Sequence, residues 1–249
     1  MDGIFSLIII KKNKKMSKNV LYIHGMGGNG HDGFFNSLVD QLGYKVSNIG
    51  QIYFNTLDYD FDPEKAQEQI YKAVNFFRPD LIIATSLGAF HAQMFPNIPR
   101  ILISPALNAG KVIAQIGEEL EKDPFKRLMI ETSLSNTKGC QTLTTNPKIL
   151  KKFQALADKI DQNIESLKNC SAYAIYGGND MYMQMNVVNP KHFEVIFNSI
   201  NYDIIPSCDH NFSEFDVIDY IVPKIYEFLG IDEHDFIIDT RTDIFSHSL

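Results

Sequence analysis

Short apolar runs alternate with longer amphipathic segments along most of the chain. Several runs are apolar at every position, which is typical of strands in a parallel sheet that helices cover on both faces. The predicted strands are Val20–His24, Lys45–Ile49, Leu81–Ala84, Ile101–Ser104, Ala172–Tyr176 and Tyr202–Pro206. The segment Gln51–Phe54 fits either a continuation of the second strand or a loop.

The amphipathic segments carry signals for the start of a helix. Side chains that accept hydrogen bonds from the first turn, two of them followed by proline, precede apolar residues at helical spacing. These starts are Asp32, Asp62-Pro63, Asn189-Pro190 and Ser213. The alternation of strands and helices predicts an α/β fold with a mostly parallel sheet flanked by helices.

One stretch interrupts this alternation, because no convincing strand occurs between Ala106 and Asn169. Helical periodicity is present in Lys111–Leu120, in Pro124–Ile130 and in a long segment from Asn146-Pro147 to Leu167, whereas Glu131–Thr145 is polar and loop-like. We therefore predict one domain, residues 16–249, with a helical cap inserted at about 106–170. The insertion fits either a lid or an oversized crossover.

Composition narrows the class of protein. The 249 residues are 45% hydrophobic and 21% charged, as in ordinary globular domains. The net charge of −7 and the lack of a basic stripe argue against a nucleic-acid partner. The three cysteines, Cys140, Cys170 and Cys208, have no CxxC spacing, which favours a reducing compartment and a cytoplasmic location.

The first fifteen residues hold an apolar run, residues 3–10, followed by four lysines. The run is shorter than the ~20 residues that span a bilayer, and its charges follow the run, whereas in a secretory signal they precede it. We expect no membrane partner and treat residues 1–15 as an extension without a catalytic role. A chain that starts at Met16 and loses activity or solubility would contradict this.

The strand at Leu81–Ala84 leads through Thr85 to Ser86, and helical spacing begins at Leu87. A serine at a tight strand-to-helix turn, with small residues two positions before and after it, is typical of a nucleophile elbow. Here these residues are Ala84, in place of the usual glycine, and Gly88. A serine-capped βα turn is the alternative for this segment.

A serine nucleophile needs a base and a group that orients the base. Asp180 follows the strand Ala172–Tyr176, and His210 follows Tyr202–Pro206. The order Ser86, Asp180, His210 is that of α/β-hydrolases, and strand ends are where open α/β sheets build their sites. Asp209 is a less suitable partner, because adjacent side chains rarely meet in triad geometry.

The loop after the first strand is rich in glycine, so its backbone can approach a substrate. We predict an oxyanion hole from the N–H groups of Leu87 and Met26, with Gly27 as the alternative second donor. His24 is expected to brace this loop. The residues assigned to substrate binding are His24, Gly25, Gly27 and Met181.

The same loop contains Gly25, Gly27 and Gly30 in the pattern G-x-G-x-x-G, which also occurs in dinucleotide-binding proteins. An acidic residue is expected at the end of the next strand to bind the ribose, but the nearest candidate, Asp58, comes late. The histidines have no partners at metal-ligand spacing, so we expect no metal and no cofactor. A catalytically inactive hydrolase fold used for binding is the other alternative.

Together these motifs resemble the α/β-hydrolase superfamily. Within it, four segments are most similar to small bacterial YqiA-like esterases. They are His24-Gly25, Ser86 to Ala89, Ile103 to Asn108 and Asp209 to Phe212. The resemblance implies a small-molecule substrate, a short acyl ester or thioester, that a Ser-His-Asp triad cleaves through an acyl-enzyme. This chain departs from that group in two features, because Ala84 replaces the expected elbow glycine and the helical insertion is long.

Overall fold

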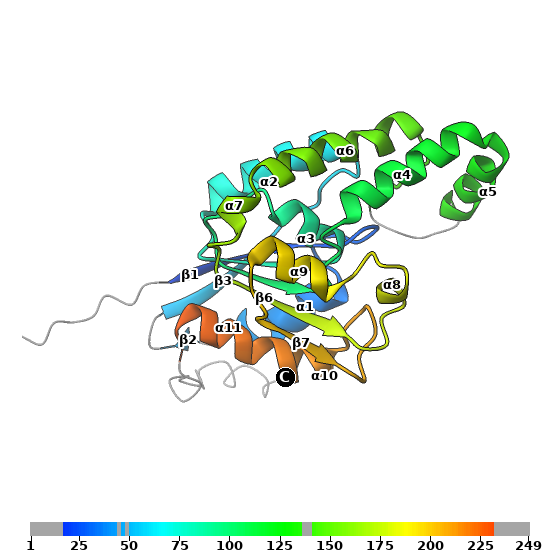
Figure 1. Ribbon diagram of the computed structural model, residues 1–249. Coiled ribbons are helices and arrows are strands. Elements are labelled where there is room, and N and C mark those ends of the chain that lie inside the picture. The colour runs from blue at the N-terminus through cyan, green and yellow to red at the C-terminus, as the bar shows by residue number, and fades with distance from the viewer. Residues whose placement is uncertain (1–16, 44–45, 48–49, 136–140, 232–249) are drawn as a thin grey trace, which may run out of the picture.

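The computed structural model of the chain describes residues 17–43, 46–47, 50–135 and 141–231. In these ranges seven strands form one sheet in the order β2-β3-β1-β4-β5-β6-β7 (Figure 1). The strands are β1 (Lys18–Ile23), β2 (Val46–Ser47), β3 (Gly50–Thr56), β4 (Leu81–Thr85), β5 (Arg100–Ile103), β6 (Ala172–Gly177) and β7 (Tyr202–Ile205). All neighbours pair in parallel except β2 and β3, which confirms the predicted α/β sheet.

The second predicted strand is misplaced in the sequence interpretation. The strand that pairs in parallel with β1 is β3, with Lys18 opposite Ile52 and Tyr22 opposite Thr56. Gln51–Phe54 therefore lies in a central part of this strand. Of the predicted Lys45–Ile49, only Val46 and Ser47 form the short antiparallel β2, and the other three positions lie outside the described residues.

Helices cover both faces of the sheet, as Figure 1 shows. On one face lie α1 (Gly33–Leu38), η1 (Val39–Gly43), α10 (Glu214–Asp216), η2 (Val217–Ile221) and α11 (Val222–Leu229). On the other lie α2 (Pro63–Phe77), α3 (Leu87–Ala92), α6 (Pro147–Gln162) and α9 (Pro190–Phe197). Successive residues of β1 enter the two cores alternately, Tyr22 on the α1 face and Ile23 on the α3 face. Burial on both faces explains why the strands are apolar at every position.

The predicted helix starts are confirmed by their capping bonds. Each cap side chain accepts a backbone N–H from the first turn of its helix, which satisfies one of the donors that a helix start leaves unpaired. The pairs are Asp32 with Phe35, Asp62 with Glu64, Asn146 with Lys148, Asn189 with Lys191 and Ser213 with Asp216.

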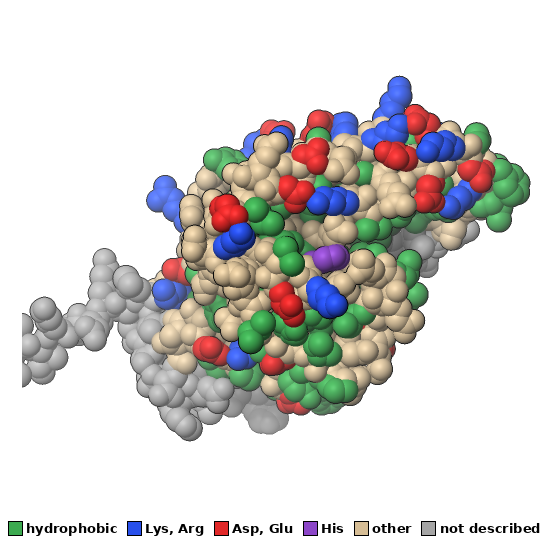
Figure 2. All heavy atoms as spheres, viewed as in Figure 1, with side chains coloured by type: hydrophobic (Ala, Val, Ile, Leu, Met, Phe, Trp, Pro, Cys, Tyr) green, Lys and Arg blue, Asp and Glu red, His purple; other side chains and the backbone are tan. Residues whose placement is uncertain are grey.

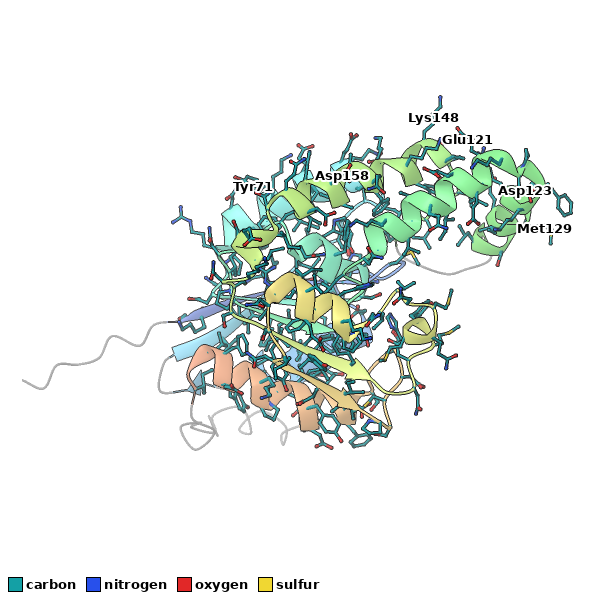
Figure 3. All side chains as sticks on the ribbon, viewed as in Figure 1. Tyr71, Glu121, Asp123, Met129, Lys148 and Asp158 are labelled. Atoms are coloured by element: carbon teal, nitrogen blue, oxygen red, sulfur yellow. The ribbon has the colours of Figure 1, made fainter. Side chains whose placement is uncertain are left out.

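Four helices follow β5 and precede β6: α4 (Ala109–Lys122), α5 (Pro124–Ser135), α6 and α7 (Ile164–Leu167). α4 packs closely on α6 at Gly117. A Cβ at this position would lie 2.7 Å from Leu150 Cβ, so the close approach requires glycine. Lys148 and Asp158 lie on the outer, exposed side of α6, and Asp123 and Met129 lie at the far end of the insertion (Figure 3).

Two details of the insertion differ from the prediction. α5 continues past Ile130 to Ser135. The long helix predicted to reach Leu167 is broken at Asn163, whose side chain donates to the Lys159 carbonyl. At Asn163 a side-chain-to-backbone bond thus accompanies the end of the helix.

The surface of the insertion carries acidic and basic side chains in close alternation (Figure 2). None of the described helices is long and apolar enough to cross a bilayer. Cys170 and Cys208 are free thiols, whereas Cys140 and the predicted extension, residues 1–15, lie outside the described ranges.

Candidate active site

Ser86 occupies the turn between β4 and α3 in a backbone conformation that non-glycine residues seldom adopt, with φ 49° and ψ −117°. Three backbone hydrogen bonds hold it there, one of them from the Ala89 N–H to the Ser86 carbonyl at 3.1 Å. The Ser86 N–H donates to the Ile103 carbonyl at 3.0 Å, and its carbonyl accepts from the Ala106 N–H at 3.2 Å. The turn is therefore the strained strand-to-helix geometry expected of a nucleophile elbow.

The small residues around Ser86 allow close backbone packing. A Cβ at Gly88 would lie 2.3 Å from the Ile23 carbonyl oxygen, so α3 can approach β1 only if this position is glycine. A Cβ at Gly25 would lie 3.1 Å from Ser86 Cβ. Ala84, where the usual motif has glycine, is fully buried within β4 between Ile23 and Leu102, and its single methyl group fits.

Ser86, His210 and Asp180 form a continuous hydrogen-bonded chain. His210 Nε2 lies 3.0 Å from Ser86 Oγ, and His210 Nδ1 lies 2.7 Å from Asp180 Oδ2. Asp180 is buried, and its other oxygen accepts the Tyr182 N–H at 2.8 Å, where it caps α8 (Met181–Gln184). Asp209, the neighbour of His210, is exposed.

Two glycines bring the aspartate and histidine loops together. A Cβ at Gly177 would lie 2.1 Å from the Asp209 carbonyl oxygen, and one at Gly178 would lie 2.8 Å from Pro206 Cα. The loops that carry Asp180 and His210 can therefore meet only beside a Gly-Gly pair. The sequence contains this signal directly after a strand, but the sequence interpretation did not use it.

The glycine-rich loop folds back on itself beside Ser86. The Gly28 N–H donates to the Gly25 carbonyl at 3.2 Å, and the Gly27 N–H donates to Gln141 Oε1 at 3.0 Å. Within the described residues, no acceptor pairs with the N–H of Met26 or of Leu87. Two unpaired donors thus lie at the cavity that Ser86 lines.

His24 braces this loop from below. Its buried ring stacks on Tyr59 at a centroid distance of 4.2 Å, and its Nδ1 lies 2.7 Å from the Gly25 carbonyl. The Tyr59 hydroxyl in turn donates to the His24 carbonyl at 2.7 Å. Burial lowers the pKa of His24, which favours its neutral form.

Ser86 and His210 line a cavity of about 750 Å³, and Asp180 is buried behind them. Of the four residues assigned to substrate binding, only Gly25 lines the cavity. His24 is buried beneath the loop, the Gly27 N–H turns to Gln141, and Met181 is 60% exposed at the start of α8. The cavity wall includes residues that the sequence interpretation missed, namely Tyr22, Asp32, Phe34, Val112, Ile113, Ile116, Tyr182, Val187 and Val188.

The described residues include no group of three or more histidine, cysteine or carboxylate side chains placed to hold a metal ion. His91 is buried against Tyr59, and its Nδ1 lies 2.9 Å from Gln67 Nε2. It thus packs behind the elbow and does not line the cavity.

No protein family matches the sequence, and no curated protein matches it significantly. Solved structures do match. Est1E from Butyrivibrio proteoclasticus has 14% identity and a TM-score of 0.56, covering 88% of this chain and 91% of its own. A thermophilic esterase from Thermogutta terrifontis has 13% identity and a TM-score of 0.52, covering 87% and 90%. With the strand order and the elbow, these matches show that the chain has the α/β-hydrolase fold.

Proposed function

We propose that the protein is a serine hydrolase that cleaves carboxylic esters through an acyl-enzyme. The observation that carries this proposal is the hydrogen-bonded chain from Ser86 Oγ through His210 to Asp180, which begins at a strained elbow and faces a cavity. Ser86 is the nucleophile, His210 the base and Asp180 the group that orients the base.

The contacts support one direction of proton transfer. An ionised carboxylate only accepts hydrogen bonds, so His210 Nδ1–H donates to Asp180 and leaves Nε2 to accept from the Ser86 hydroxyl. When Ser86 Oγ attacks the ester carbonyl, its proton moves to Nε2. That proton then passes to the leaving alkoxide, and the acyl group stays on Ser86. Water, deprotonated by His210, attacks the acyl-enzyme and releases the acid.

The oxyanion formed in each step needs donors that are already in place. We assign the N–H groups of Leu87 and Met26. The bond from the Gly27 N–H to Gln141 supports this choice, because it engages the alternative donor and leaves that of Met26 unpaired. Both assigned residues line the cavity beside Ser86.

The solved structures support an ester substrate of small size. One neighbour is named an esterase, another is E-2-(acetamidomethylene)succinate hydrolase, and Est1E has been solved with ferulic acid bound. The choice between esters and thioesters, and the short acyl chain implied by the resemblance to YqiA-like esterases, stay predictions.

The dinucleotide alternative is disfavoured by the way the glycine loop uses its donors. The Gly27, Gly28 and Gly30 N–H groups already donate to Gln141, Gly25 and Asp58, respectively. The Asp32 carboxylate also caps the start of α1, where a pyrophosphate would bind. A fixed negative charge at that helix start opposes a second one.

A fluorophosphonate probe tests the proposal and the inactive-fold alternative together. We expect the probe to label the wild type and to fail with Ser86→Ala and His210→Ala. Ser37→Ala is a matched control, since Ser37 lines the same cavity but has no histidine partner. Hydrolysis of p-nitrophenyl esters should fall by roughly 10⁴-fold or more in both triad variants. A folded wild type that neither labels nor hydrolyses these esters would refute the proposal.

A further inference from the structure

The active-site cavity has two chemically different ends, because it crosses the edge of the sheet where Ser86 lies. On the α3 face its wall is aliphatic and comes from α4 and the segment after α8, through Val112, Ile113, Ile116, Val187 and Val188. On the α1 face its wall is aromatic and acidic, through Tyr22, Asp32, Phe34 and Glu214. The triad stands between these ends.

The Asp32 carboxylate is held firmly at the α1 end. Oδ1 accepts the Phe35 N–H at 2.9 Å, and Oδ2 accepts the Tyr22 hydroxyl at 2.7 Å. The Tyr22 oxygen also lies 3.1 Å from Thr85 Oγ1, one residue before Ser86. Burial and the nearby Asp32 raise the pKa of Tyr22, so the tyrosine keeps its proton and donates it. A short hydrogen-bonded chain thus links Asp32 to the nucleophile turn.

Hydrogen bonds from Phe35 and Tyr22 hold the Asp32 carboxylate, but no described basic side chain forms an ion pair at this end of the cavity. No lysine or arginine of the described chain lines the cavity, and neither Asp32 nor Glu214 pairs with a described basic side chain. The two carboxylates belong to the same end, because α10 contacts α1. A negatively charged substrate group would be repelled there, whereas a positive charge would be attracted.

Aromatic rings complete the surroundings of Asp32. Phe34 stacks on Tyr22 at a centroid distance of 5.5 Å, and both rings line the cavity. An alkylammonium group is favoured beside aromatic rings and next to a carboxylate, because both attract its diffuse positive charge. Neutral apolar groups gain from the rings alone and place no positive charge beside the carboxylate.

We propose that the α1 end of the cavity receives an alkylammonium group of the ester substrate, and that Asp32 selects for it. The proposal rests on the serine hydrolase function. It assigns to Asp32 a specificity role, distinct from the chemical roles of the triad. The aliphatic end then receives the uncharged part of the ester.

Two pairs of isosteric esters test this, because the charge can lie on either side of the ester bond. Butyrylcholine is compared with 3,3-dimethylbutyl butyrate. The p-nitrophenyl ester of 4-(trimethylammonio)butanoate is compared with that of 5,5-dimethylhexanoate. In at least one pair we expect the wild type to have a higher kcat/KM for the cationic ester than for the neutral one. In Asp32→Asn the ratio of cationic to neutral kcat/KM should be lower by roughly tenfold.

The substituted asparagine still accepts the Phe35 N–H, so α1 keeps its cap. Asp40→Asn is the matched control, since it removes the same charge from an exposed position outside the cavity, and it should leave both ratios unchanged. Glu214→Gln, an exposed substitution, provides a second variant if Asp32→Asn fails to fold, and should lower the same ratio.

Binding of phenyltrimethylammonium by calorimetry does not depend on turnover. Weaker binding by Asp32→Asn than by the wild type and Asp40→Asn supports the cation site even if no ester is hydrolysed, in which case only the hydrolase proposal fails. Two results overturn the cation site and leave the hydrolase proposal standing. In the first, the wild type hydrolyses the neutral esters and prefers neither cationic ester. In the second, the preference for the cationic ester is the same in Asp32→Asn and Glu214→Gln as in the wild type. Absence of phenyltrimethylammonium binding in the wild type also overturns the cation site.

Discussion

Gly88 shows how a single residue controls the geometry around Ser86. The position would place a Cβ 2.3 Å from a backbone oxygen of β1, a contact that neither segment can relieve without moving. Gly33, by comparison, has nothing within 4 Å of a Cβ. Substituting alanine at these two glycines therefore separates steric effects from the general effect of removing a glycine.

We expect Gly88→Ala to lower the free energy of unfolding by roughly 3 kcal/mol or more, because α3 must shift away from β1. Gly33→Ala should change it by less than about 1 kcal/mol, since alanine suits a helix. Urea denaturation measures both. Equal stability of the two variants would show that α3 does not pack on β1 as described.

His91 predicts a dependence of stability on pH. Its burial lowers its pKa to about 3 in the folded protein. The unfolded chain binds a proton near the ordinary value of about 6.5, so between these pKa values the unfolded state holds more protons and acid destabilises the fold. Stability from this group is fully present above about pH 6.5 and decreases as the pH falls towards about 3.

We expect the wild type to lose about 2 kcal/mol more than His91→Gln between pH 7 and pH 5, as measured by urea midpoints at both pH values. His31→Gln, which removes an exposed histidine, should behave like the wild type. An identical pH dependence in the wild type and His91→Gln would mean that His91 is not held neutral.

The residues that meet at the triad were predictable from sequence, because each follows an apolar strand and parallel strands end at one edge. The residues of the cavity wall were less predictable from the sequence. Met181 and Met185 belong to the same alternating pattern after Asp180. Only the rotation of α8 decides that Met185 lines the cavity and Met181 does not. That rotation depends on tertiary packing.

At the scale of elements, buried polar side chains connect the ends of helices and loops. Arg100 at the start of β5 is fully buried, and its guanidinium donates to the carbonyls of Ala92, Phe95 and Ile98 at and after the end of α3. Gln141 connects the insertion to the glycine-rich loop, donating to the Tyr59 carbonyl at 3.0 Å and accepting from Gly27. Each side chain adds hydrogen bonds to backbone groups of segments that are distant in the sequence or follow a helix end.

Arg100→Lys should destabilise the fold by roughly 3 kcal/mol, because one ammonium group cannot reach three separate carbonyls. Thermal and urea unfolding measure the change. Arg127→Lys, at a partly exposed position of α5, is the control and should change stability by less than about 0.5 kcal/mol. An unchanged stability of Arg100→Lys would show that the three hydrogen bonds from the guanidinium contribute little to the fold.

Gln141→Ala should lower kcat for a p-nitrophenyl ester by roughly tenfold with a smaller effect on KM, because the loop that supplies the Met26 N–H loses its connection to the insertion. Gln141→Glu keeps the acceptor for Gly27 and should recover part of kcat. A rise in KM alone would indicate that Gln141 acts on substrate binding and not on the oxyanion.

The order of the elements was predictable, whereas three of their boundaries were not. Helix starts depend on a cap residue and the next few positions, so Asp62 and Asn146 were informative in the sequence alone. The position of β3 depends on which of two adjacent apolar runs pairs with β1, and that choice is made by long-range contacts.

At the scale of the whole molecule, α4 serves both the core and the cavity. Gly110 packs on Phe90 of α3, where a Cβ would lie 2.3 Å from the ring, and Gly117 packs on α6. Val112, Ile113 and Ile116 of the same helix line the cavity, and Ile113 also packs against the core. The insertion is thus packed on the core and forms part of the cavity wall, and the choice between a lid and an oversized crossover stays a prediction.

Ile113→Ala should enlarge the aliphatic end of the cavity and move the preferred acyl chain of p-nitrophenyl esters to greater length, because the volume removed is open to the substrate. The control is Gln115→Ala on the exposed side of α4, for which no shift is expected. A preference that stays at the wild-type length would show that acyl chains do not occupy this end.

The close packing of α4 has a consequence for how such a protein can diverge. The strand ends carry the groups assigned to bond cleavage, while α4 and the start of α1 provide most of the surfaces assigned to selectivity. Substitutions on the cavity side of α4 leave the glycine contacts beneath it intact. Single mutations in one gene copy can therefore change the substrate range without loss of the fold or of the groups assigned to catalysis.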